Sequence, residues 1–113
     1  MNIYDWMNEQ SRRREVEGMR ATPFSRVVCM DGFSVSVQAS EYAYCHPRDN
    51  FGPWFSVELG FPNRRMPSLS QYAENKKAHT KTIFGYVPIS AVHDLIESHG
   101  GIVPVKERQS PQF

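Results

Sequence analysis

The strongest constraint on the fold is the stretch 33–40, in which apolar and small polar side chains alternate. Its apolar positions are Phe33, Val35, Val37 and Ala39, and its polar positions are Ser34, Ser36, Gln38 and Ser40. A period of two residues is typical of a strand with one buried and one solvent-facing side. The pair Asp31-Gly32 precedes it and favours a two-residue type I′ turn, and the β-branched segment Phe24–Met30 comes before that pair. The sequence therefore predicts an antiparallel hairpin.

Further strands are predicted over Trp54–Phe61 and Thr80–Val87, because both carry alternating or β-branched apolar residues. In the first of these strands Phe55, Val57, Leu59 and Phe61 share the predicted buried face. An edge strand is expected over Gly101–Val105, where Pro104 suits only an edge. A loop over 41–53 is predicted between the second and third strands. A short helix over 68–75 and a mobile segment over 76–79 are predicted between the third strand and the strand that begins at Thr80.

Two helices are predicted, over Tyr4–Met19 and Pro88–His99. The second has a regular apolar stripe, Pro88 in its first turn and Gly100 as its stop. The apolar positions of the first are interrupted from Gln10 to Arg14, so we expect it to pack loosely or against a partner, such as a second copy in a homodimer. The predicted class is α+β: one domain, 1–113, with an N-terminal helical segment, 1–22, a core, 24–105, and a flexible tail, 106–113. An antiparallel sheet of three to five strands is expected to carry the C-terminal helix on one face.

Charge and length exclude several classes of protein. The chain has 113 residues and a net charge of +1, unlike strongly acidic DNA mimics or strongly basic general nucleic-acid binders. The longest apolar runs are far shorter than a membrane span, and no secretory signal is expected at the N-terminus. The charge is nevertheless uneven: five cations oppose one anion over 61–82, whereas 27–60 has a net charge of −3.

The first candidate site is the polar face of the sheet together with loop 41–53. Aromatic rings can stack on a base, and an arginine can hold a phosphate or a carboxylate, so this region could form a pocket of nucleotide size. The alternative, which the commonness of solvated faces on antiparallel sheets favours, is that the face is simply wet. The candidate ligand- or partner-binding residues are Ser36, Gln38, Tyr42, Tyr44, His46, Arg48, Asn50 and Trp54.

The second candidate is a basic contact patch made of Arg64, Arg65, Lys76 and Lys77, which suits phosphates or an acidic protein surface. The triplet Arg12-Arg13-Arg14 lies among glutamates and is expected to be a solvated helix face.

Catalysis is not expected. Adjacent Cys45 and His46 point apart in an extended chain, and a buried thiol is the expected role of Cys45. Neither Cys-x-x-Cys nor His-x-x-x-His spacing occurs, so no metal is predicted. With no phosphate loop and no nucleophile motif, the sequence favours a protein without enzymatic activity and without a cofactor. Cys29 and Cys45 are expected to be reduced in a cytosol.

The segments 31–48, 58–62 and 85–101 resemble small accessory proteins of tailed bacteriophages, over about two thirds of the chain. The resemblance implies action in the cytoplasm of a bacterial host, where such proteins often block a defence system. We therefore expect a non-enzymatic inhibitor that binds a host defence protein, such as a CRISPR effector. One alternative is a sponge that sequesters a cyclic nucleotide signal, and a third is a small phage enzyme or structural accessory. The aromatic and arginine side chains suited to a protein interface are Trp6, Tyr44, Arg48, Trp54 and Tyr72.

Overall fold

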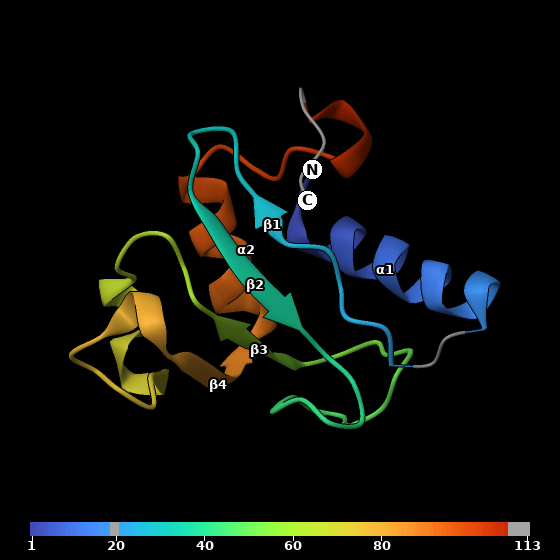
Figure 1. The fold of residues 1–113 in the computed structure, drawn as a ribbon, viewed down its shortest axis with the longest axis horizontal. Coiled ribbons are helices and arrows are strands. Elements are labelled where there is room, and N and C mark those ends of the chain that lie inside the picture. Colours follow the sequence, from blue (N-terminus) through green and yellow to red (C-terminus); the bar gives the residue numbers. More distant parts are fainter. Residues whose placement is uncertain (19–20, 109–113) are drawn as a thin grey trace.

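A four-stranded antiparallel sheet with strand order β1-β2-β3-β4 is the frame of the protein, as a computed structural model describes it for residues 1–18 and 21–108 (Figure 1). The strands are β1 (Val27–Val28), β2 (Ser34–Gln38), β3 (Ser56–Gly60) and β4 (Ile83–Pro88). Helix α1 (Ile3–Glu17) precedes the sheet, and helix α2 (Ile89–Ser98) follows β4 directly. The predicted α+β class is therefore confirmed.

Helix α2 packs against β4, and helix α1 packs against α2, so both helices share one core with the sheet. Figure 1 shows α2 behind the sheet and α1 beside it. Val92 and Ile96 of α2 are fully buried, as are Ile3 and Trp6 of α1. Tyr4 and His93 join the two helices, with ring centroids 5.4 Å apart. Helix α2 ends in two successive left-handed glycines, and Gly101 N donates to Ile96 O, so the predicted glycine stop is confirmed.

The predicted hairpin is present, although its turn differs from the expected type. Phe33, Val35, Val37 and Ala39 are all 0% exposed, which confirms the alternation. Cys29 N donates to Phe33 O, and Gly32 N donates to Cys29 O, so the loop contains three residues, Met30–Gly32. Only Gly32 is left-handed, with φ 90°, whereas a type I′ turn needs two such residues. The two-residue turn was therefore wrong.

Three predicted strands are shorter than expected. Phe55 and Phe61 lie outside β3 and are 74% and 52% exposed, so the predicted buried face was wrong at both residues. Phe61 adopts φ 50°, so the extended backbone of β3 ends there. Segment 24–26 is not in β1, because the backbone N–H and C=O of Phe24 hydrogen-bond to the side chain of Gln38 and not to the backbone of a neighbouring strand. Segment 101–105 makes only a single bridge, between Cys29 and Ile102.

Helix α1 matches its predicted range closely, but its packing was predicted incorrectly. Asn2 caps it by accepting from Asp5 N, and left-handed Gly18 ends it. Gln10 and Arg14 continue the buried stripe and are only 5% and 1% exposed. The helix therefore packs along its length inside this chain, and the expectation of a loose helix with a solvated arginine triplet was wrong at Arg14. The homodimer stays a prediction, although the loose helix no longer supports it.

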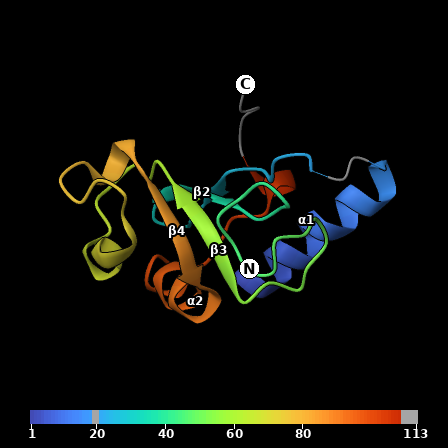
Figure 2. The same ribbon diagram turned by 90° about the horizontal axis from the view of Figure 1, so that it is seen from below.

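Residues 61–82 form a lobe that projects beyond the ends of β3 and β4 (Figures 1 and 2). It contains two 3₁₀ helices, η1 (Pro67–Tyr72) and η2 (His79–Lys81). Leu69 is buried, and His79 is only 1% exposed. His79 Nδ1 accepts from Met66 N, and its ring meets the Phe84 ring edge-on at 5.4 Å. The predicted mobile segment 76–79 thus ends in a buried anchor.

The chain covers the outer edges of its own sheet. Beside β1, Val103 N donates to Val28 O and Met30 N donates to Gly101 O. Beside β4, Ala73 bridges to Phe84, and Glu74 N donates to Ile83 O. A 3₁₀ helix, η3 (Val105–Glu107), follows, and Arg108 donates to Arg26 O, so the predicted tail is structured as far as residue 108. Its remainder, 109–113, lies outside the described residues.

Candidate functional site

The small polar side chains along β2 and directly after it form hydrogen bonds within the protein. Ser34 Oγ accepts from Arg26 Nε, and Ser36 Oγ accepts from Gln38 Nε2. Ser40 Oγ accepts from the backbone N–H groups of residues 42 and 43. These hydroxyls therefore do not form the open platform for a nucleotide that the alternation suggested.

Loop 41–53 instead brings four of the predicted residues together beside Tyr86 of β4. The His46 ring lies 4.7 Å from the ring of Tyr86, and the Tyr44 ring lies 5.8 Å from it. The guanidinium of Arg48 is 6.0 Å from the Tyr44 ring, and it donates to Tyr42 O at 3.4 Å. We call the five residues Tyr42, Tyr44, His46, Arg48 and Tyr86 the tyrosine–histidine surface. Tyr42 is 74% exposed, and Tyr44 and Tyr86 are each 40% exposed.

Tyr86 was missed in the sequence, although it is central to this surface. The pairing of β3 with β4 shifts between Val57 and Leu59, so the extra residue of a β-bulge falls at Gly85-Tyr86. Tyr86 adopts φ 53°, and its N–H leaves the ladder to donate to Tyr44 O. A Cβ at Gly85 would lie 3.3 Å from that of Tyr44. Gly85 inside a predicted strand was the available signal, since glycine there often marks a bulge or a close approach.

Two predicted site residues have structural roles. Asn50 is 2% exposed: its Oδ1 accepts from Glu41 N, and its carbonyl accepts from Arg14. Trp54 is 8% exposed, packs edge-on against Phe24 and donates from Nε1 to Asp49 O. Both side chains hold loop 41–53 against the core, and neither faces solvent.

A pocket of about 270 Å³ lies beside Tyr42, on the polar side of the sheet. Its lining includes Gln38, Ser40 and the carboxylate-bearing Glu58. Its one cation is Arg14, whose guanidinium already donates to three backbone carbonyls. An anionic nucleotide would therefore meet a carboxylate and no available cation within the lining, which disfavours this pocket for phosphates.

Neither thiol is placed for catalysis. Cys29 and Cys45 are both buried and unpaired, and burial raises the pKa of Cys29 to about 11. Burial also raises the pKa of Cys45, whose Sγ donates to Ser40 O. Cys45 points inward while His46 is exposed, as the sequence predicted. Thiols with raised pKa values are poor nucleophiles at neutral pH.

Two serine–histidine contacts occur among the described residues, and neither resembles an activated nucleophile. Ser56 Oγ lies 3.4 Å from His46 Nδ1, beyond the usual reach of about 2.6–3.2 Å, and Ser56 is 7% exposed. Ser70 Oγ lies 3.2 Å from His79 Nε2. Because His79 Nδ1 accepts from Met66 N, its proton is on Nε2, so neutral His79 cannot take a proton from Ser70. No carboxylate hydrogen-bonds either ring in the described residues.

The predicted basic patch is divided. Arg64 turns toward the hairpin, where it lies 3.6 Å from Asp31 Oδ2 and donates to Asp31 O. Arg65 lies 3.4 Å from His79 Nε2, while Lys76 and Lys77 are exposed between η1 and η2. All four predicted residues therefore lie in the projecting lobe, but Arg64 contacts the hairpin and is separated from the other three.

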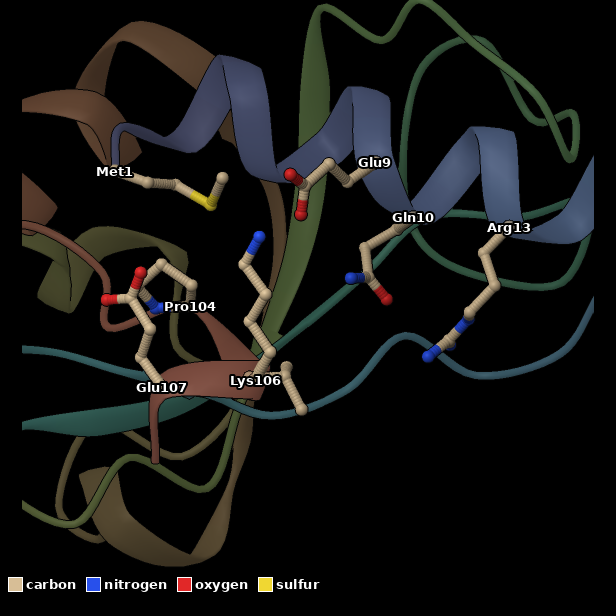
Figure 3. Close-up of a pocket in the computed structure, with 8 residues that line it drawn as sticks. Met1, Glu9, Gln10, Arg13, Pro104, Lys106 and Glu107 are labelled. Carbon is tan, nitrogen blue, oxygen red and sulfur yellow. The ribbon is translucent and has the colours of Figure 1, made fainter. Parts of the chain in front are cut away.

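A larger pocket of about 490 Å³ separates α1 from η3 (Figure 3). Glu9, Gln10 and Arg13 line it from the helix, while Lys106 and Glu107 line it from η3. Acidic and basic side chains both line this pocket, so the charge of its lining favours neither anionic nor cationic ligands. In residues 1–18 and 21–108, no cluster of three or more metal-binding side chains occurs, and neither helix is long and apolar enough to cross a membrane.

Comparison of the chain with protein-family models, with curated proteins and with solved structures found no match. The resemblance to phage accessory proteins therefore stays a prediction.

Proposed function

We propose that this protein is a non-enzymatic inhibitor of phage origin, which binds a host defence protein through the tyrosine–histidine surface. The phage setting rests on the resemblance described above. The choice of surface rests on its composition, because tyrosine and arginine are enriched among the residues that dominate protein interfaces. Tyr42, Tyr44 and Arg48 are exposed side chains of these two types within one loop.

The observation that carries the proposal is the backbone of Tyr86. A non-glycine residue at positive φ costs about 1–3 kcal/mol, and it persists where the surroundings hold it or where function uses it. The contacts of the Tyr86 ring with His46 and Tyr44 return about 0.5–1.5 kcal/mol for each aromatic pair. These terms are comparable, so the ring offers little net gain in stability while being 40% exposed. A role in recognition explains why an aromatic residue occupies this position.

The surface is also preorganised. Tyr44 is held at both backbone groups, since its N–H donates to Glu58 Oε1 and its carbonyl accepts from Tyr86 N. Arg48 is tied to Tyr42 O. A surface that is ordered before binding loses less conformational entropy when a partner docks. We expect a partner with a flat apolar area and a carboxylate placed to meet Arg48.

The test combines a binding assay with a phage assay. Tagged protein is used to capture partners from lysate of a CRISPR-immune bacterium, and the same protein is expressed there during phage challenge. We expect one stoichiometric host protein, together with restored phage plating. The double variant Tyr44→Ala/Tyr86→Gly is expected to lose both effects, while Arg65→Ala/Lys77→Ala keeps them.

Two outcomes would contradict the proposal. If the surface variant still captures the host protein and restores plating, another surface is responsible. If denaturation releases a nucleotide and no host protein is captured, the cyclic-nucleotide sponge is the better explanation. That second candidate would have to use the pocket beside Tyr42, whose lining disfavours phosphates, and Tyr42→Ala would then lower the nucleotide content.

A further inference from the structure

The projecting lobe carries a concentration of positive charge that the tyrosine–histidine surface does not use. Arg65, Lys76, Lys77 and Lys81 are all exposed on it. Glu74 is the only acidic residue between positions 61 and 82. Unlike Arg64, which is paired with Asp31, none of these four cations lies within salt-bridge distance of a carboxylate in the described chain.

An exposed aromatic ring stands at the base of the same lobe. Phe61 is 52% exposed and adopts φ 50° directly after β3. Both of its backbone groups are held: its N–H donates to Thr82 O at 3.0 Å, and its carbonyl accepts from Arg26 Nη2 at 2.6 Å. Thr82 follows Lys81 in the chain, so the fixed ring lies close to the cationic segment.

The lobe itself is stiffened from within. His79 joins Met66, Ser70 and the neighbourhood of Arg65 around one buried ring. The backbone segments that carry Arg65 and Lys81 therefore flank a common buried anchor, because Met66 follows Arg65 and Lys81 ends the 3₁₀ helix that begins at His79. An exposed aromatic ring beside a group of cations is the arrangement that proteins use to hold unpaired nucleotides.

We propose that this lobe binds single-stranded nucleic acid, with Phe61 stacking on a base and Arg65, Lys76, Lys77 and Lys81 contacting phosphates. A duplex is disfavoured because its bases are already stacked and cannot cover the Phe61 ring. Phosphate charge complements the four cations, and a base complements the exposed ring. An acidic protein surface would satisfy only the cations.

The test is fluorescence anisotropy with a labelled oligothymidine of about 20 nucleotides, titrated at several salt concentrations. Contacts with three or four phosphates predict a slope of log K against log salt of about −2 to −3. Binding should therefore weaken roughly 15- to 60-fold between about 50 mM and 200 mM KCl. Lys76→Ala/Lys77→Ala should make the slope shallower by about 1.4. The matched control is Arg12→Ala/Lys106→Ala, which removes two exposed charges elsewhere and should leave the slope unchanged.

Phe61→Asn tests the ring, because asparagine tolerates the left-handed backbone. Loss of one stacked base predicts roughly 5- to 160-fold weaker binding with an unchanged salt slope. The proposal fails if no oligonucleotide binds at low salt, if the control variant has the same effect as the lobe variant, or if duplex DNA binds equally well. If no oligonucleotide binds and the lobe variant instead loses a captured protein, the lobe recognises an acidic protein surface. Each of these outcomes is independent of the tyrosine–histidine surface.

Discussion

Replacement of Arg14 by methionine should destabilise the protein strongly. The guanidinium donates to Thr22 O at 2.9 Å, to Ala39 O at 2.7 Å and to Asn50 O at 2.9 Å, and it lies 4.0 Å from the centre of the Phe24 ring. It therefore fastens α1, the chain after it, the end of β2 and loop 41–53 together. Methionine keeps the apolar stem but leaves these carbonyls without their donor.

The magnitude follows from the two fully buried carbonyls, Ala39 O and Asn50 O. Each unpaired buried acceptor costs about 1–3 kcal/mol, which gives roughly 2–6 kcal/mol in total. Burial lowers the pKa of Arg14, which shows that the charge is itself costly to bury, and removing it returns part of this sum. We expect a net loss of about 3 kcal/mol, which corresponds to a melting temperature lower by roughly 10 °C.

Urea unfolding followed by tryptophan fluorescence measures this loss, and thermal melting provides a second estimate. Arg12→Met is the matched control, because Arg12 is exposed on the same helix, and it should change stability by less than about 0.5 kcal/mol. Arg14→Lys should fall between the wild type and Arg14→Met, since one ammonium cannot reach all three carbonyls in the same fork. If the free energy of unfolding of Arg14→Met is within about 0.5 kcal/mol of the wild-type value, the hydrogen bonds of Arg14 do not hold the fold together.

Three further predictions concern the lobe, the bulge and loop 41–53. Burial, and after it the charge of Arg65, lowers the pKa of His79 in the folded protein, so the unfolded chain binds this proton more readily. The contribution of neutral His79 to the free energy of unfolding is therefore fully present above about pH 6.5, and it should fall as the pH drops below that value. His79→Gln should flatten that decline in urea midpoints measured from pH 7.5 to 5.5, and an unchanged decline would assign it to another group. Tyr86→Gly relieves the positive φ and should leave stability within about 1 kcal/mol of the wild type while abolishing partner capture; a large loss of stability would instead make Tyr86 a structural residue. Gly52→Ala places a Cβ 2.5 Å from the Trp54 ring at φ 74° and should cost about 2–4 kcal/mol in thermal melts, whereas Gly18→Ala, at φ 67° with no atom within 4 Å, should cost about 1 kcal/mol; equal losses would contradict the predicted clash.

Sequence reasoning succeeded where the determinants are local. The alternation over 33–40 predicted both the strand and its buried face, and the stripe from Ile89 to Ile96 with Gly100 predicted α2. It failed at Arg14, because the burial of that arginine depends on carbonyls that are distant in sequence, at Ala39 and Asn50. Without those acceptors in view, an arginine on a helix is read as solvated.

The candidate site shows the same division. Loop 41–53 was recognised from its aromatic residues and Arg48, and four of its predicted residues do come together. Tyr86 was not recognised, because its position depends on a bulge and on a left-handed tyrosine, which propensities do not favour. Asn50 and Trp54 were misread as site residues, because polar and aromatic side chains that brace a loop resemble those that bind a ligand.

The covered edges of the sheet have a consequence for how recognition can change. Segment 101–103 pairs beside β1, residues 73 and 74 pair beside β4, and the rest of β4 is broken by its bulge and by Pro88. In the described chain, a partner therefore has little free strand edge on which to add a strand of its own, and edge-to-edge self-association is suppressed. A partner must therefore be recognised mainly through exposed side chains, because the backbone of the sheet edges is already hydrogen-bonded within the chain. Binding specificity can then change by substitution of exposed side chains such as Lys77 without changing the backbone hydrogen bonds that hold the fold.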